Sequence, residues 1–557
     1  MNRIRSERRT DAGNGVVRLA FVAFAAVLQI YFFYLMMSWL DNYSTVIHLI
    51  VELLAVILVL GIYGQHITTS MKLPWIVLIT SAPVLGVTLW FLMASKSATK
   101  PMAGRFGRME EAMSVFLKQE SGRQETLRGQ SSASFGVASY LWRRGRFPLY
   151  ADEGCRYYAN AAEAFEAQLE DLRNARHYIF MEYFAIEDKE SFARVREILR
   201  QKAAEGLDVR LFYDDVGSIG FISLQFQDRL REEGIQAKVF NPVLPGLRVF
   251  MNNRDHRKIT VIDGRIAYTG GYNIANEYFN VTHPYGEWKD AGIRVTGKAV
   301  NTFTAVFLEL WNAIRKADNA DSNFEQFFPA WNEKLRADCR IGEQAGEKIG
   351  EQAGEKTGER TEEETGTEPA GEEPYGFIQP YADAPLDEEL VGENVYMSIA
   401  NGASQYLYFV TPYLVLTDEM SRALSLAAER GADVRIVTPG IPDKKITYQL
   451  TRSYYAQLVR KGVRIYEFTP GFCHAKCCVS DDRIATCGTI NLDYRSLYHH
   501  FEDGCVLYHS RAVLDMKADM EHLIERSTEV TEQYAEGNRN VLIRGFQCVL
   551  RLAAPLF

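Results

Sequence analysis

The stretch HRKITVID, from His256 to Asp263, returns as HAKCCVSD, from His474 to Asp481. In both copies a lysine (Lys258, Lys476) stands two residues after the histidine and an aspartate stands seven residues after it. A glycine fourteen residues and an asparagine seventeen residues after each histidine also recur; they are Gly270 with Asn273 and Gly488 with Asn491. Four spacings that agree in two places indicate an internal duplication.

The duplication extends upstream of the two motifs. GLDVRL at 206–211 returns as GADVRI at 431–436, and GIQAKVFNP at 234–242 returns as GVRIYEFTP at 462–470. Each copy is typical of a helix, a β-branched strand, a second helix and another strand, an alternation that predicts an α/β fold. We expect two duplicated halves, each a mixed sheet flanked by helices, packed about a pseudo-two-fold axis and preceded by N-terminal transmembrane helices.

The pattern divides the chain into five segments. These are a membrane anchor at 1–95, a connector at 96–150, the first half at 151–340, an acidic insertion at 341–375 and the second half at 376–557. The insertion contains GEQAGEK twice, and its run from 342 to 374 has eleven Glu against three Lys or Arg. This composition cannot bury enough apolar surface to offset the entropy of ordering, so we predict that the insertion is disordered.

Three apolar stretches open the chain: Leu19 to Leu40, Thr45 to Tyr63 and Leu73 to Ala94. Each approaches the roughly 20 residues that cross a bilayer as a helix, which predicts a multi-pass protein of the cell membrane. Basic residues flank the first stretch on its amino side and the third on its carboxyl side, and both flanks favour the cytoplasm. Three full crossings cannot satisfy both flanks, and Glu52 makes the second stretch the weakest span.

The apolar carboxy terminus, Val541 to Phe557, has two interpretations. It could lie on the membrane as an amphipathic helix, but we favour docking onto its own domain, because terminal helices commonly bury one face that way.

The formal net charge of −9 is concentrated in the acidic insertion, and the rest of the chain is close to neutral. A nucleic-acid partner is therefore not expected, since it would require a basic surface. The eight cysteines do not form the dense framework of a small disulfide-bonded domain. Cys473, Cys477 and Cys478 surround His474 but lack the second ligand pair of a zinc site, so we expect no metal.

Each motif carries side chains suited to a phosphodiester. His256 and Lys258 lie two residues apart on a strand and project from the same face, as do His474 and Lys476. If the halves pack face to face, two imidazoles and two ammonium groups converge on one phosphate, with Asn273 and Asn491 as amide donors. One imidazole can then attack phosphorus while the other donates a proton to the departing alkoxide, and no metal or other cofactor is required.

The motif aspartates have two readings. Asp263 and Asp481 could take part in catalysis with the histidines and lysines, but we favour binding to the backbone of their own halves. Each catalytic histidine then needs another carboxylate within hydrogen-bond reach. Glu277, 21 residues after His256, and Glu502, 28 residues after His474, are the candidates that we favour as orienting groups.

The motifs resemble the paired signatures of the phospholipase D superfamily, as HRKITVID with TGGYN and HAKCCVSD with CGTINLDYRS. Further stretches are similar to bacterial cardiolipin synthases, a branch of that superfamily. They are MEYFAIE at 181–187, YDDVGS at 213–218, GEWKD at 286–290, TPYLVLTDEM at 411–420, YEFTPGFCHAK at 466–476 and KLPWIVLITSAPVLGVTLWFL at 72–92.

The resemblance implies a reaction in which two phosphatidylglycerol molecules give cardiolipin and glycerol through a phosphohistidine intermediate. It implies phosphatidylglycerol and membrane lipids as partners, no cofactor, and His256 as the nucleophile with His474 as general acid. A phospholipase D-type hydrolase, a transphosphatidylase with another donor or acceptor such as phosphatidylethanolamine, and a catalytically silent membrane scaffold are the alternatives. The sequence does not give the oligomeric state.

Overall fold

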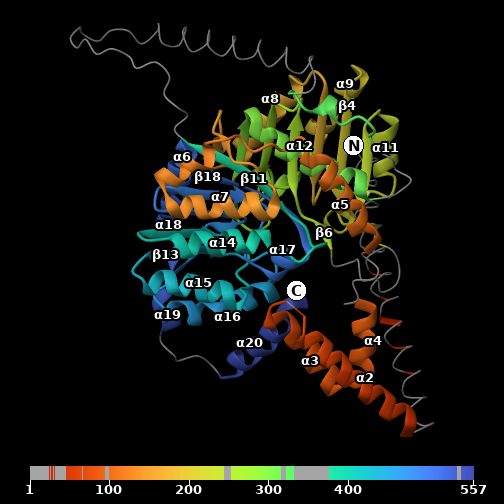
Figure 1. Cartoon of the computed structure of the whole chain (residues 1–557), viewed down its shortest axis with the longest axis vertical. Helices are drawn as coiled ribbons and strands as arrows, with labels where there is room; N and C mark the ends of the chain where they lie inside the picture. Colours follow the sequence, from red (N-terminus) through yellow and green to blue (C-terminus); the bar gives the residue numbers. More distant parts are fainter. Residues whose placement is uncertain are drawn as a thin grey trace.

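The computed structural model describes residues 45–65, 67–93, 100–243, 253–314, 321–330, 376–535 and 541–556, together with a few isolated positions between 20 and 35. The acidic insertion predicted at 341–375 and the apolar stretch Leu19 to Leu40, apart from those isolated positions, lie outside the described residues. Figure 1 shows a body of two sheets flanked by helices, with helices from the amino-terminal region below it.

The first sheet has seven strands and is mixed. Its strands β3, β4 and β5 run parallel, whereas β7, β8, β10 and β2 continue the sheet with antiparallel pairs. In spatial order the strands are β2 (Arg156–Tyr158), β10 (Gly292–Thr296), β8 (Ile266–Gly270), β7 (Lys258–Ile262), β3 (Tyr178–Tyr183), β4 (Asp208–Asp214) and β5 (Gln236–Phe240). The mixed sheet predicted for the first repeat is therefore present.

The second sheet has ten strands and repeats this order. Its central path β18-β17-β16-β12-β13-β14 corresponds strand for strand to β10-β8-β7-β3-β4-β5. The strands are β1 (Tyr150–Ala151), β11 (Phe377–Asp383), β18 (His500–Tyr508), β17 (Ile484–Gly488), β16 (Cys477–Ser480), β12 (Tyr406–Val410), β13 (Asp433–Pro439), β14 (Arg464–Phe468) and β19 (Thr528–Glu529), with β6 (Arg254–Asp255) beside β18. The structure thus carries the duplication that the motif spacing predicts.

Helices cover the sheets in corresponding places in the two repeats. In the first repeat they are α8 (Ala161–Arg173), α9 (Glu190–Ala204), α10 (Asp215–Ser218), α11 (Phe226–Glu232) and α12 (Val300–Ala313). In the second they are α14 (Val391–Gly402), α15 (Asp418–Glu429), α16 (Lys445–Val459), α17 (Tyr494–Tyr498) and α18 (Arg511–Glu525). Local signals set their starts: Asn160 caps α8 and Thr417 caps α15, each by accepting a backbone N–H of the first turn.

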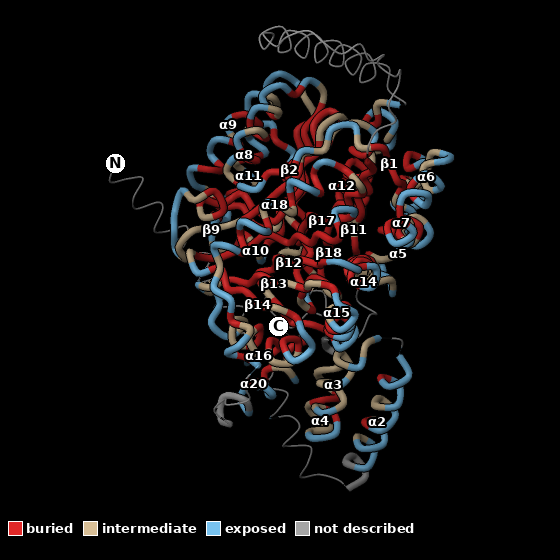
Figure 2. The backbone as a smooth tube through the Cα atoms, turned by 90° about the vertical axis from the view of Figure 1, so that its left-hand side faces the viewer, coloured by how far each residue is buried: buried red, intermediate tan, exposed pale blue. Residues whose placement is uncertain are grey.

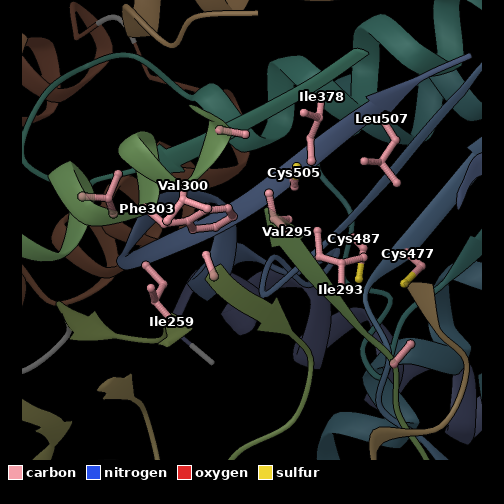
Figure 3. Packing of buried hydrophobic residues seen from close by; sticks show 14 of the residues in the cluster. Ile259, Ile293, Val295, Val300, Phe303, Ile378, Cys477, Cys487, Cys505 and Leu507 are labelled. Atoms are coloured by element: carbon pink, nitrogen blue, oxygen red, sulfur yellow. The ribbon is translucent and has the colours of Figure 1, made fainter. Parts of the chain in front are cut away.

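The largest hydrophobic core lies between the two sheets and belongs to both repeats. Figure 3 shows Val295 and Ile293 of the first repeat close to Cys505 and Cys487 of the second. Figure 2 shows the buried backbone running without interruption through the centre of the body. Because neither repeat completes this core alone, burial of apolar surface holds the two together.

Three helices connect the amino-terminal region to the two repeats: α5 (Lys100–Ser114), α6 (Arg123–Gln130) and α7 (Ser132–Gly145). The first of these packs on α12 of the first repeat, and α7 packs on α14 of the second. The segment between the apolar amino-terminal stretches and the repeats therefore contacts both repeats.

The apolar stretch Leu73 to Ala94 does not form the single helix predicted for it. It folds as α3 (Thr69–Ser81) and α4 (Pro83–Met93), and the backbone leaves helical geometry at Ala82, with φ −143° and ψ 76°. Pro83 explains the break, because a proline disfavours helical geometry in the residue before it. The two helices pack closely, since a Cβ on Gly86 would lie 2.5 Å from the Cα of Ile79.

The second apolar stretch forms α2 (Thr45–Tyr63), with the bounds predicted from the sequence. Within the described ranges, however, no helix combines the length and the apolar character that a membrane crossing requires. The predicted set of up to three membrane spans is therefore not confirmed. Figures 1 and 2 both place α2, α3 and α4 together, away from the centre of the body.

The carboxy-terminal helix α20 (Val541–Ala553) docks onto the second repeat, as favoured from the sequence. After α19 (Thr531–Ala535) it packs on α16, where Arg551 donates a hydrogen bond to Gln457 at 2.9 Å and lies over the ring of Tyr454. The helix also contacts α3, while its side chains Phe546 and Val549 are exposed.

Candidate active site

A short strand precedes each motif histidine and pairs with a strand of the other repeat. Strand β6, which ends next to His256, pairs in parallel with β18 of the second repeat. Strand β15 (Gly471–Cys473), which ends next to His474, pairs in parallel with β9 (Glu287–Lys289) of the first. The N–H of His256 then donates to the carbonyl of Phe501 at 2.9 Å, and that of His474 to the carbonyl of Lys289 at 2.7 Å.

The residue after each of these carbonyls is the carboxylate partner of the histidine. Nδ1 of His256 lies 2.9 Å from Glu502, and Nδ1 of His474 lies 2.7 Å from Asp290. All four side chains are buried. Each histidine is thus oriented by a carboxylate of the opposite repeat, and its Nε2 is left for chemistry.

Of the two predicted orienting carboxylates, Glu502 contacts a motif histidine, His256, whereas Glu277 is not the partner of His474. The partner of His474 is Asp290, thirteen residues further along the chain. Strand pairing reveals the equivalence: Gly292 pairs with Gly270 in the first sheet as Gly504 pairs with Gly488 in the second. Asp290 and Glu502 each stand two residues before the paired glycine, a signal that a comparison of the segments DAG and EDG could have found.

Lys258 and Lys476 are buried beside their histidines. Nζ of Lys258 donates to the carbonyl of His256 at 2.5 Å, and Nζ of Lys476 lies 3.0 Å from Nε2 of His474. Burial lowers the pKa of Lys258 to about 8, and burial together with the charge of Lys258 lowers the pKa of Lys476 to about 7. The charge of Lys258 thus acts on Lys476 of the other repeat.

Both histidines are held in the neutral form. Burial lowers the pKa of His256 to about 3, with a further contribution from Lys258. Burial and the charge of Lys476 lower the pKa of His474 to about 4. Burial would raise the pKa of Asp290, but its interactions with His474 and Lys476 lower it below the ordinary range. Two neutral imidazoles with ionised partners leave two Nε2 lone pairs beside the two buried lysines.

The motif aspartates do not touch this site. Asp263 accepts the backbone N–H groups of Arg176, His177 and Tyr178 at the start of β3. Asp481 does the same at the start of β12, where it accepts from residues 404 to 406. Asp263 and Asp481 therefore satisfy backbone donors of their own repeats, the arrangement that the sequence favours over a catalytic role.

The two asparagines differ in their environments. Oδ1 of Asn273 accepts the N–H of Ala185 at 3.0 Å and its Nδ2 donates to the hydroxyl of Tyr278 at 2.8 Å, so these contacts occupy its amide. Oδ1 of Asn491 is buried and has no hydrogen-bond partner among the described residues. The two predicted amide donors therefore differ: one N–H of Asn273 is used by Tyr278, whereas the amide oxygen of Asn491, an acceptor, has no partner among the described residues.

The surroundings of the two histidines are also unequal. His474 is packed among the rings of Tyr278, Trp288 and Phe472, whereas His256 is packed against Phe184 and His500. Thr489 donates to Glu502 at 2.5 Å, while its counterpart Gly271 has no side chain to offer Asp290. Asp290, Thr489 and His500 are members of the site that the motif spacing does not reveal. Within the described residues, one group of side chains is spaced to hold a metal ion, and it consists of His256, His500 and Glu502.

Comparison with known proteins agrees with this geometry. Residues 169–311 and 396–524, one stretch in each repeat, match the family model described as cardiolipin synthase, PLD-like domain. An uncharacterized protein of Streptococcus mutans is 35% identical over 498 residues, which cover 89% of this chain and 99% of that protein. The cardiolipin synthase of Halalkalibacterium halodurans is 29% identical over 510 residues, which cover 90% of this chain and 91% of that protein.

A solved structure shares the fold. The phosphatidylserine synthase of Haemophilus influenzae superposes with a TM-score of 0.51 at 16% identity, covering 76% of this chain and 99% of that one. At this identity the likeness concerns the arrangement of the two repeats.

Proposed function

Because this chain belongs to the family of cardiolipin synthases with phospholipase D-like domains, we propose that it joins two phosphatidylglycerol molecules into cardiolipin and releases glycerol. The observation that carries the proposal is the pair of buried histidines, each held by a carboxylate of the opposite repeat, beside two buried lysines. This arrangement suits one phosphodiester, whose negative charge the two ammonium groups balance.

In the first step Nε2 of His256 attacks the phosphorus of a bound phosphatidylglycerol. The P–N bond forms, the P–O bond to the departing glycerol breaks, and His474 gives its proton to the glycerol oxygen. Glu502 accepts the Nδ1 hydrogen of His256 and stabilises the positive charge that develops on the ring. The choice of His256 as nucleophile rests on the family resemblance, since both imidazoles have the required partners.

In the second step the hydroxyl of another phosphatidylglycerol attacks the phosphohistidine. His474 takes the proton of that hydroxyl, the new P–O bond forms and the P–N bond breaks. His474 must be protonated before the first step, although its pKa is about 4 in the free site. A phosphodiester anion bound between the lysines adds the negative charge that favours this protonation.

We also place the protein at the membrane that holds its substrates. The outer face of α2 supports this, because Leu49, Leu53, Val56 and Leu60 are all exposed. Exposed apolar surface of this extent on one helix is typical of contact with lipid or another protein. Retention of the full chain in the pellet after alkaline carbonate extraction of membranes is the expected result, and release into the supernatant contradicts it.

The reaction is tested with the purified full chain and phosphatidylglycerol vesicles, with products identified by mass spectrometry. We expect cardiolipin from the wild type and none from His256→Ala or His474→Ala, while His522→Ala, a change at an exposed histidine, retains activity. Phosphatidic acid as the main product would instead identify a hydrolase, and cardiolipin formed only with added phosphatidylethanolamine would identify another donor. Products that are the same for wild type and both active-site variants would contradict the proposal.

A further inference from the structure

The two half-sites differ at one pair of equivalent positions. Trp288 stands two residues before Asp290, and His500 stands two residues before Glu502. Each side chain packs against the motif histidine of its half-site, with ring centroids 5.3 Å apart for Trp288 and His474 and 5.5 Å apart for His500 and His256. One half-site therefore has an apolar ring where the other has an imidazole.

The imidazole of His500 is buried beside Glu502. Its side chain is 8% exposed, and neither ring nitrogen has a hydrogen-bond partner among the described residues. Its Nδ1 lies 3.6 Å from Oε1 of Glu502, just beyond hydrogen-bond distance. A buried polar group in this state costs free energy unless something else contacts it. The ring of His500 lies beside Glu502 and His256, and these three side chains together offer ligand atoms for a metal ion.

We propose that His256, His500 and Glu502 form a binding site for a divalent transition-metal ion, with Zn²⁺ as the best-fitting ion, and that the bound ion blocks the catalytic centre. One potential ligand atom from each of the three side chains lies within 4.8 Å of the other two. Two imidazoles and one carboxylate are a ligand set that zinc uses with a fourth position open to water or another oxygen. Small rotations of the three side chains bring their donor atoms to the roughly 2 Å at which zinc binds nitrogen and oxygen.

The ligand types favour a transition metal over calcium or magnesium. Ca²⁺ and Mg²⁺ bind mainly through oxygen atoms, and this cluster offers one carboxylate. The nearby ammonium of Lys258 opposes any cation. Coordination by imidazole nitrogen compensates for that repulsion with zinc or cobalt and not with the hard ions.

Blocking follows from the identity of the ligands. A metal ion on Nδ1 of His256 replaces its hydrogen bond to Glu502 and turns the ring away from its orientation in the site. A metal ion on Nε2 occupies the lone pair that would attack phosphorus. The equivalent half-site cannot bind a second ion in the same way, because Trp288 offers no lone pair. We therefore expect one ion per chain.

The binding test uses the purified full chain, freed of metal and titrated with Co²⁺ as a spectroscopic substitute for Zn²⁺. We expect visible absorption bands of four- or five-coordinate cobalt with one ion per chain, and displacement of the cobalt by Zn²⁺. His500→Asn should weaken the affinity at least tenfold. His499→Asn is the matched control, because it makes the same change at the adjacent residue, which lies outside the cluster. Circular dichroism checks that both variants are folded.

Equal cobalt affinity in wild type and His500→Asn would overturn the proposal, as would a loss of affinity that is the same in the two variants. This readout does not need turnover, so it stays valid if the lipid reaction proposed above proves wrong. A second arm measures product formation from phosphatidylglycerol at increasing Zn²⁺. We expect inhibition that EDTA reverses and that shifts to at least tenfold higher Zn²⁺ in His500→Asn but not in His499→Asn. Unchanged activity at saturating Zn²⁺ would contradict the blocking role.

Discussion

The two orienting carboxylates act on histidines that lie far from them in sequence. Asp290 is 184 residues before His474, and Glu502 is 246 residues after His256. Each accepts a hydrogen bond from Nδ1 of its histidine and so fixes Nε2 as the ring nitrogen that is left for chemistry. Loss of this acceptor leaves the ring in place but removes the stabilisation of its charged form.

Asp290→Asn should lower kcat for cardiolipin formation by roughly 10²- to 10⁴-fold, with a smaller change in KM, because the amide cannot stabilise an imidazolium. Steady-state kinetics on phosphatidylglycerol in detergent micelles measures the effect. Glu277→Gln is the matched comparison, since this acid is not the partner of His474, and its kcat should stay within about twofold of wild type. A large loss in Glu277→Gln with none in Asp290→Asn would reverse this assignment.

Lys476 links the site to pH. Its pKa of about 7 lies below the ordinary value of 10.5, so between these values the unfolded chain binds a proton that the folded chain lacks. The free energy of unfolding should therefore rise with pH in this window, by up to about 1.4 kcal/mol per pH unit from this residue. In denaturant unfolding at pH 7 and pH 9, Lys476→Met should lack this part of the rise. The exposed Lys445→Met should keep it, and parallel curves for wild type and Lys476→Met would refute the link.

At this scale the sequence identifies the histidines and lysines but not all of their partners. The motif residues have the same spacing in both repeats, whereas Asp290 follows Asn273 by seventeen residues and Glu502 follows Asn491 by eleven. Because the two spacings differ, the equivalence of Asp290 and Glu502 can be recognised only from the strand pairing. The roles of Asp263 and Asp481 were open for a different reason, because spacing does not tell which way a carboxylate at a turn points.

Among the elements, the short pair of strands β9 and β15 has a steric requirement. A Cβ on Gly471 would lie 2.0 Å from the carbonyl oxygen of Glu287, so any side chain there pushes the strands apart. Because β15 leads directly into His474, Gly471→Ala should displace the imidazole. A displacement of about 1 Å at a catalytic group costs roughly 10²-fold in rate.

The measurement is kcat for Gly471→Ala, with circular dichroism to confirm that the chain is folded. Gly136→Ala is the control, because a Cβ at this position in α7 meets no atom within 4 Å. It should leave kcat unchanged and leave stability equal or slightly higher, since alanine favours a helix over glycine. Full activity in Gly471→Ala would show that the contact between β9 and β15 does not position His474.

Element types could be predicted where the pattern is local. The repeated strands and helices follow from periodicity and glycine positions, and α2 begins and ends where its apolar stretch does. The hydropathy of the stretch Leu73 to Ala94 predicts one helix, but Pro83 divides it into α3 and α4. Strands β6 and β9, with two and three residues, carry no periodicity, so only tertiary pairing reveals them.

For the whole molecule, the shared core predicts that neither repeat is stable alone. Ile293 and Val295 of the first repeat pack with Cys505 and Leu507 of the second, and β1 and β6 complete the sheet of the second repeat. We expect residues 376–557 expressed alone to aggregate or elute as an expanded chain in size-exclusion chromatography. Expression together with residues 1–375 should restore a compact complex. A compact, cooperatively unfolding monomer of 376–557 would contradict a shared core.

The duplication makes the pseudo-two-fold arrangement predictable from sequence, but not the exchange of strands between repeats. Pairing of β1 with β11 joins residue 151 to residue 377, and such non-local contacts leave no mark in a local pattern. The three amino-terminal stretches show the same limit. Their hydropathy does not reveal how α3 and α4 pack against each other.

Strands β6 and β15 each pair with a strand of the opposite repeat, so each histidine–carboxylate pair can form only after residues of both repeats have been synthesised. During translation His256 is incorporated 246 residues before Glu502. Its imidazole therefore leaves the ribosome before its hydrogen-bond acceptor, Glu502, has been synthesised. Asp290 is likewise synthesised before its partner, His474. A truncated product that ends between the repeats contains neither pair, so translation must pass Glu502 before both histidines have their carboxylate partners.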